Sequence, residues 1–225
     1  MRVLIIGGTR FIGPEVVRQL HALGHDVTVF HRGQTIANLP PGVQHIFGNR
    51  KYLCHFLDEV KSTSPDVVLD MIPITERDAA TLMSTFEGLT QRVVGISSQD
   101  VYRAYGVLNG SEPGPLEPMP IFEDSPLRTV LYPYRGSTLR GADDAQKHLD
   151  DYDKILVERA FMENSNLPGT ILRLPMVYGP NDYQHRLHEY VKRMEDERPV
   201  IFLQEDMARW RWTRGYVDNV ASSIT

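Results

Sequence analysis

Cysteine is almost absent from this chain of 225 residues, which contains only Cys54. A single cysteine excludes an internal disulfide framework and is typical of a reducing compartment. Long hydrophobic runs are absent too, because no segment approaches the ~18 consecutive apolar residues of a membrane span. No signal peptide opens the sequence. These absences predict a cytoplasmic protein without a membrane partner.

An excess of positive charge is also absent, because the formal net charge is -5. Such a chain does not attract polyanions in general, so nucleic acid is not an expected partner. The spacing of His185, His188 and Glu189 is close to that of metal ligands. No third ligand is indicated beside them, so we interpret them as a solvated helix face and expect no metal.

Apolar, β-rich runs alternate with amphipathic stretches along the chain. We expect strands at 3–6, 26–30, 43–47, 66–69, 92–97 and 169–172, and helices at 11–23, 53–61, 75–86 and 151–164. This alternation is typical of right-handed βαβ units. It predicts an α/β fold, a Rossmann-type doubly wound parallel sheet with helices on both faces, over residues 1–175. We interpret the long glycine- and proline-rich loop at 102–148 as a lid over the site.

A glycine turn follows the first expected strand and precedes the first expected helix. Gly7 permits a tight turn, Gly8 adds freedom beside it, and Gly13 lets the helix pack closely on the strand. Backbone N–H groups at such a helix start face a pyrophosphate. The turn therefore predicts a dinucleotide site made of Gly7, Gly8, Thr9, Arg10, Phe11, Ile12 and Gly13.

The end of the second expected strand bears on the choice of cofactor. An NAD-selective site places a carboxylate there for the ribose 2′-hydroxyl, whereas the 2′-phosphate of NADP calls for cations. Here His31 and Arg32 occupy that position, and Arg10 stands in the turn. NADP is therefore favoured over NAD as the cofactor. The alternative is that Arg32 is only a solvated cation of the loop and binds no phosphate. Asn49, after the third strand, is a candidate for the adenine or an ordinary turn residue.

Further segments resemble a known superfamily. The run Gly95-Ile96-Ser97-Ser98-Gln99-Asp100-Val101-Tyr102 resembles the Ser-Ser-x-x-Val-Tyr signature of the extended short-chain dehydrogenases/reductases, the NAD-dependent epimerase/dehydratase family of nucleotide sugars. Residues 172–180 and 216–221 resemble two later segments of that family. The resemblance implies an NAD(P)-binding oxidoreductase, epimerase or dehydratase whose small-molecule substrate is a nucleotide-linked or related sugar. It also implies that residues 176–225 begin a substrate domain that is cut short here.

In that family a serine, a tyrosine and a lysine perform the chemistry. The resemblance assigns Ser98 to the serine, which binds the reacting oxygen, and Lys154 to the lysine, which lowers the tyrosine pKa and binds the nicotinamide ribose. The tyrosine is expected four residues before the lysine, where this chain has Asp150. Three interpretations stay open. In the first, the helix begins late and Tyr152 is the catalytic tyrosine. In the second, Tyr134 is the catalytic tyrosine, displaced in the sequence. In the third, the hydride chemistry is lost and the chain is a catalytically silent NAD(P)-binding protein. We take Ser98, Tyr152 and Lys154 as the candidate catalytic set.

The Gly-Gly-Thr-Arg-Phe-Ile-Gly turn also resembles a narrower set of atypical members, which includes the chloroplast stem-loop RNA-binding proteins. This resemblance implies an RNA-interacting protein as an alternative function. The cluster Arg209, Trp210, Arg211, Trp212 and Arg214 would suit stacking on bases. It fits a sugar-nucleotide diphosphate pocket at least as well, and an ordinary partly buried aromatic hairpin best. The acidic balance argues against a phosphate-backbone partner. Assembly into a homo-oligomer is left open.

Overall fold

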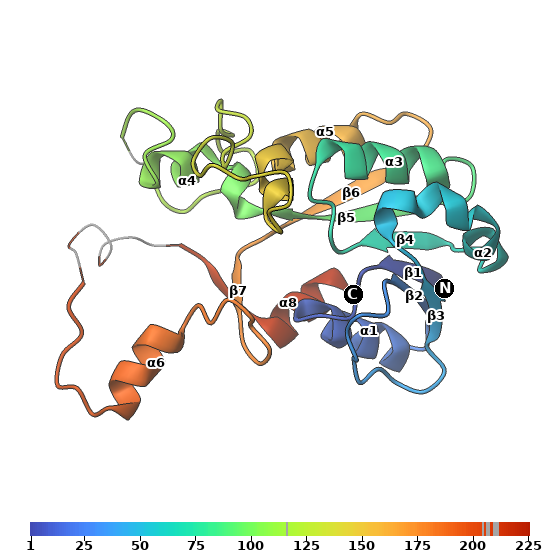
Figure 1. The fold of residues 1–225 in the computed structure, drawn as a ribbon, viewed down its shortest axis with the longest axis horizontal. Coiled ribbons are helices and arrows are strands. Elements are labelled where there is room, and N and C mark those ends of the chain that lie inside the picture. Colours follow the sequence, from blue (N-terminus) through green and yellow to red (C-terminus); the bar gives the residue numbers. More distant parts are fainter. Residues whose placement is uncertain (116, 204, 206–207, 209–211) are drawn as a thin grey trace.

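The computed structural model describes residues 1–115, 117–203, 205, 208 and 212–225. Its centre is a six-stranded sheet with the strand order β3-β2-β1-β4-β5-β6, in which every neighbouring pair is parallel (Figure 1). The strands are β1 (Arg2–Ile6), β2 (Asp26–His31), β3 (Gln44–Phe47), β4 (Val67–Asp70), β5 (Arg92–Ser98) and β6 (Gly169–Leu174). The order reverses between β1 and β4, so their carboxyl ends form the crevice where open α/β sheets bind ligands.

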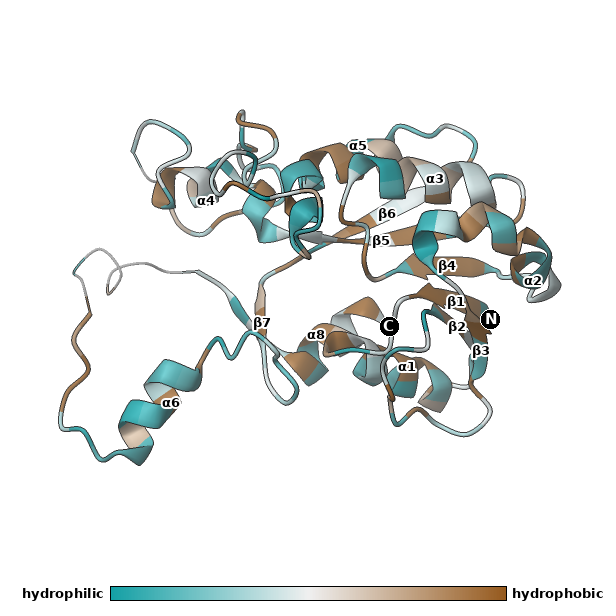
Figure 2. Cartoon of the chain, in the orientation of Figure 1, coloured by the Kyte–Doolittle hydropathy of each residue, from teal (hydrophilic) through white to brown (hydrophobic). Residues whose placement is uncertain are grey.

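Helices cover both faces of this sheet. One face packs against α1 (Ile12–Ala22) and α8 (Val217–Ile224), and the other packs against the 3-10 helix η1 (Arg50–Phe56), α2 (Leu57–Ser62), α3 (Glu76–Phe86) and α5 (Lys154–Met162). Successive strand residues point to opposite faces. Leu4 and Ile6 therefore join the core under α3 and α5, whereas Val3 and Ile5 join the core under α1. Figure 2 shows the central strands mostly in brown, as apolar segments. The expected Rossmann-type doubly wound sheet is confirmed.

The helix ends follow from local chemistry. Thr75 begins α3 as a capping box, because its hydroxyl accepts from the N–H of Asp78 (3.1 Å) and the Asp78 carboxylate accepts from the N–H of Thr75 (3.1 Å). Gly24, with φ of 81°, follows the end of α1 in the left-handed region that favours glycine. These signals place α1 and α3 within a residue of the expected ranges.

The segment expected as the long loop 102–148 contains more structure than its sequence indicates. It follows the 3-10 helix η2 (Gln99–Val101), holds the short helix α4 (Arg103–Leu108), and ends in the 3-10 helix η3 (Lys147–Asp151). The buried carboxylate of Glu112 accepts from the N–H groups of Thr129 (2.6 Å) and Val130 (2.7 Å), which ties two parts of the segment together. A helix of six residues is too short to show a periodic pattern. The function of this segment as a lid stays a prediction.

Residues after β6 form a second, smaller element group. Strands β7 (Met176–Tyr178) and β8 (Arg214–Tyr216) pair in parallel, and α6 (His188–Glu195) lies on a segment that extends away from the sheet (Figure 1). The strand β8 leads directly into α8, whose Ser222 hydroxyl donates to the Gln19 side chain of α1 (2.9 Å). Part of residues 176–225 therefore belongs to the layer over the sheet. The division into two domains stays a prediction, and Arg209, Trp210 and Arg211 lie outside the described residues.

Within the described ranges, no helix is both long enough and apolar enough to cross a bilayer.

Candidate active site

The glycine turn forms a cradle that excludes side chains. Gly7 and Gly8 have φ angles of 102° and 85°, and the Gly7 N–H donates to the Phe30 carbonyl of β2 (2.9 Å). A Cβ at Gly13 would lie 2.5 Å from the Cα of Gly8, which is closer than real contacts allow. The backbone of the turn and the start of α1 are therefore packed directly together. A dinucleotide pyrophosphate fits this cradle, because main-chain N–H groups at a helix start bind phosphate without competition from side chains.

Arg10 and Phe11 of the turn lie against Tyr183, in the segment that follows β7. Thr9 is half-buried, and Ile12 begins α1 and packs in the cluster around Val177. The Arg10 guanidinium lies 5.2 Å from the ring centre of Tyr183, and the Phe11 ring meets the same ring edge-on at 6.3 Å. Arg10 thus borders the glycine cradle, and its guanidinium lies over an aromatic ring.

The end of β2 contains one exposed cation and one paired imidazole. His31 Nε2 lies 2.8 Å from His45 Nδ1 of β3, so one ring donates to the other. Burial lowers the pKa of His31, and the neighbouring His45 lowers it further. His31 is consequently neutral at pH 7, and Arg32 beside it is exposed. Of this pair, Arg32 is the residue that offers a positive charge to a 2′-phosphate.

Asn49 takes part in a local turn. Its side-chain oxygen accepts from the N–H of Lys51 (3.1 Å) and caps the 3-10 helix η1. The amide nitrogen of the Asn49 side chain stays available as a donor. The adenine contact of Asn49 remains a prediction.

A buried ion pair beside the cradle was not anticipated from the sequence. Arg50 donates to both carboxylate oxygens of Asp70 (2.7 and 2.8 Å) and to the carbonyl of Ile72 (2.6 Å). Asp70 ends β4 and is fully buried. The pair fastens the loop after β3 to the residues after β4, and a Cβ at Gly7 would touch Met71 there. An acidic residue at the end of an apolar strand is the signal that could have revealed it.

We expect Arg50→Met to lower the free energy of unfolding by about 3 kcal/mol, because it leaves the buried carboxylate of Asp70 unpaired. Urea denaturation measures this loss. The matched control is Arg2→Met, which removes a half-exposed guanidinium from Asp66 and is expected to cost less than about 1 kcal/mol. Equal losses for the two variants would contradict the assignment of Arg50 as a structural anchor.

The start of α5 determines where the tyrosines lie. The helix begins at Lys154, and the Asp153 carboxylate caps it by accepting from the N–H of Ile155 (2.9 Å). Asp150 therefore lies in η3, outside the helix, where it pairs with Arg140 (2.7 Å) and Lys147 (2.8 Å). The hydrogen bonds from Lys147 and Arg140 lower the pKa of Asp150. Asp150 is consequently an ionised partner of two cations.

Tyr152 lies on the extended residues between η3 and α5, which form a β-bridge with Thr75. This placement agrees with a helix that begins late, as one of the three interpretations requires. The Tyr152 hydroxyl donates to the Asp100 carboxylate (2.6 Å), and its neighbours include Ser98 at the end of β5. Burial raises the pKa of Tyr152 well above its usual range, and Asp100 raises it further, whereas a hydrogen bond with Ser98 lowers it.

Tyr134 lies beside Tyr152, with 5.2 Å between the ring centres. Burial raises the pKa of Tyr134, and so do the charge of Asp100 and a hydrogen bond with Tyr105 of α4. The structure thus brings both candidate tyrosines to one place.

Lys154 is buried with its ammonium between two carbonyls. Its Nζ donates to the Pro73 carbonyl (2.6 Å) and the Ile96 carbonyl (3.0 Å), and lies 5.9 Å from the Tyr152 ring centre. Burial lowers the pKa of Lys154 to about 8. An ammonium has three N–H donors, so one remains for a ribose hydroxyl. Ser98, Tyr152 and Lys154 therefore come together at the carboxyl end of β5.

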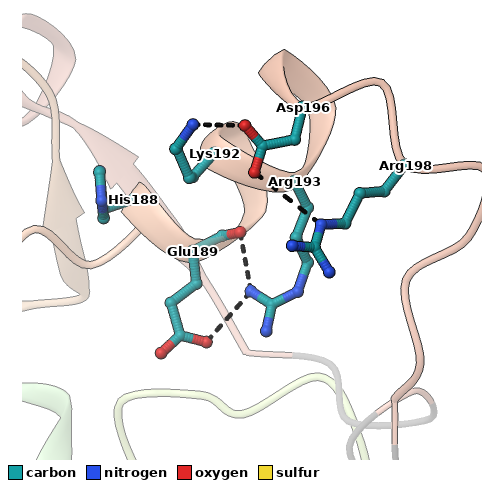
Figure 3. A pocket seen from close by; sticks show the side chains of 6 residues that line it. All are labelled: His188, Glu189, Lys192, Arg193, Asp196 and Arg198. Carbon is teal, nitrogen blue, oxygen red and sulfur yellow. Dashed lines mark hydrogen bonds and ion pairs between the residues drawn. The ribbon is translucent and has the colours of Figure 1, made fainter.

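A hollow on α6 lies in the segment that extends from the sheet, apart from the glycine cradle. Figure 3 shows the side chains that line it, which are His188, Glu189, Lys192, Arg193, Asp196 and Arg198. Arg193 pairs with Glu189, and Asp196 pairs with Lys192 and Arg198. The rings of His185 and His188 are 6.1 Å apart. In the described part of the chain, no three His, Cys, Asp or Glu side chains are grouped so that they could hold a metal ion.

Solved structures share this fold at low sequence identity. UDP-glucose 4-epimerase from Thermotoga maritima, solved with UDP-glucose, superposes with a TM-score of 0.69 at 18% identity, over 99% of this chain and 72% of that one. The Bordetella bronchiseptica enzyme WbmG, solved with NAD and UDP, gives a TM-score of 0.62 at 19% identity, over 89% of this chain and 61% of that one.

Two curated proteins match the sequence itself. The 2'-dehydrokanamycin reductase of Streptomyces kanamyceticus is 37% identical over 98 residues, which are 44% of this chain and 28% of the reductase. The chloroplast stem-loop binding protein of 41 kDa b of Arabidopsis thaliana is 32% identical over 214 residues, which are 88% of this chain and 48% of that protein. The chain spans about half, or less, of the length of these curated relatives.

The family model "NAD dependent epimerase/dehydratase family" matches residues 3–225, nearly the whole chain. The match extends from the glycine cradle through Ser98 and Lys154 to α8. Together with the Rossmann-type sheet, it confirms the resemblance found in the sequence. This chain belongs to the NAD-dependent epimerase/dehydratase family.

Proposed function

We propose that this chain binds a nicotinamide dinucleotide in the Gly7–Gly13 cradle and acts as an oxidoreductase, epimerase or dehydratase on a nucleotide-linked or related sugar. The proposal rests on one observation, which is that Ser98, Tyr152 and Lys154 lie together at the carboxyl end of β5. The glycine cradle follows β1, which is two strands away in the same sheet. Two similar structures support the substrate class, since one was solved with UDP-glucose and the other with NAD and UDP.

Each side chain has a chemical task in this proposal. The Ser98 hydroxyl orients the reacting sugar oxygen, and Tyr152 moves a proton to or from that oxygen. The free N–H of Lys154 binds the nicotinamide ribose, while its bonds to Pro73 and Ile96 fix the direction of the ammonium. When bound, the nicotinamide supplies hydride transfer to and from the sugar carbon.

The proposal is tested in two steps on the purified chain. Titration with NAD, NADH, NADP and NADPH, followed by fluorescence, is expected to give saturable binding to at least one of them. Incubation with UDP-sugars is then followed by absorbance of the reduced nicotinamide and by NMR of the sugar, because an epimerase returns the hydride and shows no net reduction. Absence of dinucleotide binding up to millimolar concentration would contradict the proposal.

For the cofactor we propose NADP in preference to NAD, supported by the exposed Arg32 and by the lack of an acidic residue at the end of β2. Arg32→Ala is expected to weaken NADPH binding about tenfold, because a charge-assisted bond to the 2′-phosphate is lost. NADH affinity is expected to stay within about twofold, since NADH lacks that phosphate. Isothermal titration calorimetry measures both, and an equal change for the two nucleotides would refute the charge argument.

A further inference from the structure

Asp100 is a buried carboxylate beside the candidate catalytic set, to which the family resemblance assigns no role. It lies in η2 and is 8% exposed. Its Oδ2 accepts the 2.6 Å bond from the Tyr152 hydroxyl. Its Oδ1 is buried without a hydrogen-bond partner among the residues that the structure describes. A buried carboxylate with one unsatisfied oxygen is costly to keep ionised, so the surroundings of Asp100 favour uptake of a proton.

Charged and titratable groups face Asp100 from several elements. From α5 and its cap come Lys154, which attracts the carboxylate, and Asp153, which repels it. From the segment before η3 comes Arg128, whose Nε donates to the Asp100 carbonyl (2.6 Å) and whose Nη2 lies 3.5 Å from Asp153. Tyr134 lies behind Tyr152 and touches its ring. Arg128 thus donates to the main-chain carbonyl of Asp100, whereas Tyr152 donates to its carboxylate.

The direction of the Tyr152 bond conflicts with a tyrosinate mechanism. The phenol proton points at Asp100, so the lone pairs of the phenol oxygen remain free to accept another proton. A tyrosinate in this position would put two negative charges in contact in a buried site, which is strongly unfavourable. Among the described residues, the hydrogen bonds of the Lys154 ammonium go to the carbonyls of Pro73 and Ile96 and not to the phenol.

We propose that Asp100 is the proton acceptor behind Tyr152, so that Tyr152 relays a proton and stays neutral throughout. When a sugar hydroxyl is oxidised, its O–H bond breaks and a new O–H bond forms on the Tyr152 oxygen. In the same step the original Tyr152 O–H bond breaks and its proton moves to Asp100 Oδ2. A bound nicotinamide would supply the acceptor for the hydride. Asp100 acts through Tyr152 and is therefore a positioning residue. The inference rests on the proposed function.

Burial raises the pKa of Asp100, against the opposing effects of Tyr152, Arg128 and Lys154. A carboxylate whose pKa lies closer to neutral is a better proton acceptor for an alcohol than an ordinary surface aspartate. The sign of the pH dependence follows from this assignment. Below its pKa, Asp100 is protonated and cannot take the proton, so the oxidation rate falls as the pH is lowered.

The first experiment needs neither cofactor nor turnover. Tyrosine ionisation is followed by ultraviolet absorbance for the wild-type chain and for Asp100→Asn, Tyr152→Phe and the double variant. We expect Asp100→Asn to move the midpoint of Tyr152 down by at least about one pH unit and that of Tyr134 by less, since a carboxylate that raises both pKa values becomes a neutral amide. The Tyr152 midpoint is expected to be missing from the double variant. The matched control is Asp66→Asn, because Asp66 precedes β4 at the amino ends of the strands, whereas Asp100 follows β5 at the carboxyl ends. This variant is expected to leave the tyrosine titration unchanged.

The second experiment uses Tyr152→Phe and therefore does not require that Asp100→Asn folds. In Tyr152→Phe the Asp100 carboxylate loses its hydrogen-bond donor, so NMR of carbon-13-labelled aspartate is expected to show Asp100 protonating at a higher pH than in the wild-type chain. An unchanged aspartate titration would overturn the inference, as would an unchanged tyrosine titration in folded Asp100→Asn. Neither result bears on dinucleotide binding, which tests the proposed function separately.

If the wild-type chain turns over a sugar, the acid limb of kcat/KM against pH is expected to disappear in Asp100→Asn. Retention of that limb in the variant would also overturn the inference.

Discussion

Replacement of Gly13 by valine is expected to abolish dinucleotide binding, with at least a 100-fold loss of affinity, about 2.7 kcal/mol. The reason is geometric, because even a Cβ at Gly13 would lie 2.5 Å from both the Cα and the carbonyl carbon of Gly8. The start of α1 must move away from the turn, and the N–H groups that face the pyrophosphate lose their arrangement. Overpacking of the buried contact is expected to lower the free energy of unfolding by about 2 to 3 kcal/mol as well. Fluorescence titration and thermal unfolding measure the two effects.

The control for this variant is Gly141→Ala, because a Cβ at Gly141 would meet nothing within 4 Å. This substitution is expected to leave dinucleotide affinity and stability unchanged. Wild-type affinity in a folded Gly13→Val protein would show that the nucleotide binds away from the Gly7–Gly13 cradle. That result would contradict the proposed cofactor site and leave the fold untouched.

Tyr152→Phe is expected to lower kcat by about 10³-fold and to leave dinucleotide affinity within a few-fold. Phenylalanine keeps the packing against Tyr134 and removes the hydroxyl that meets Asp100 and Ser98. Loss of a general acid–base group costs typically about 10²–10⁴-fold in rate. Steady-state kinetics with the sugar substrate, beside dinucleotide titration of the same protein, separates the loss of chemistry from a loss of binding.

Tyr134→Phe distinguishes between the two candidate tyrosines. Burial raises the pKa of Tyr134, and a hydrogen bond with Tyr105 raises it further, whereas the Tyr152 hydroxyl donates to the Asp100 carboxylate. We therefore expect a loss of kcat much smaller than that of Tyr152→Phe. A larger loss in Tyr134→Phe would reverse the assignment, and wild-type kcat in both variants would exclude a tyrosine-based proton transfer.

The fold was accessible from the sequence because its signals are local. Buried parallel strands such as Val3–Ile6 are continuous apolar runs, and helices such as α3 begin at recognisable caps, so the alternation of strand and helix is visible without tertiary information. The range 102–148 was less accessible. There α4 is a six-residue helix, and the buried Glu112 that organises the segment has its partners 17 and 18 residues away in the sequence.

The sequence by itself determined the Rossmann-type sheet, the glycine cradle and membership of the NAD-dependent epimerase/dehydratase family, since each depends on residue order and on main-chain geometry that glycine permits. Only the tertiary structure decided that α5 begins at Lys154 and that Tyr152 bonds Asp100. It likewise decided that Arg50 meets Asp70. These contacts join residues 20 and 52 positions apart, and side chains so distant in sequence meet only when sheet packing fixes the elements that carry them.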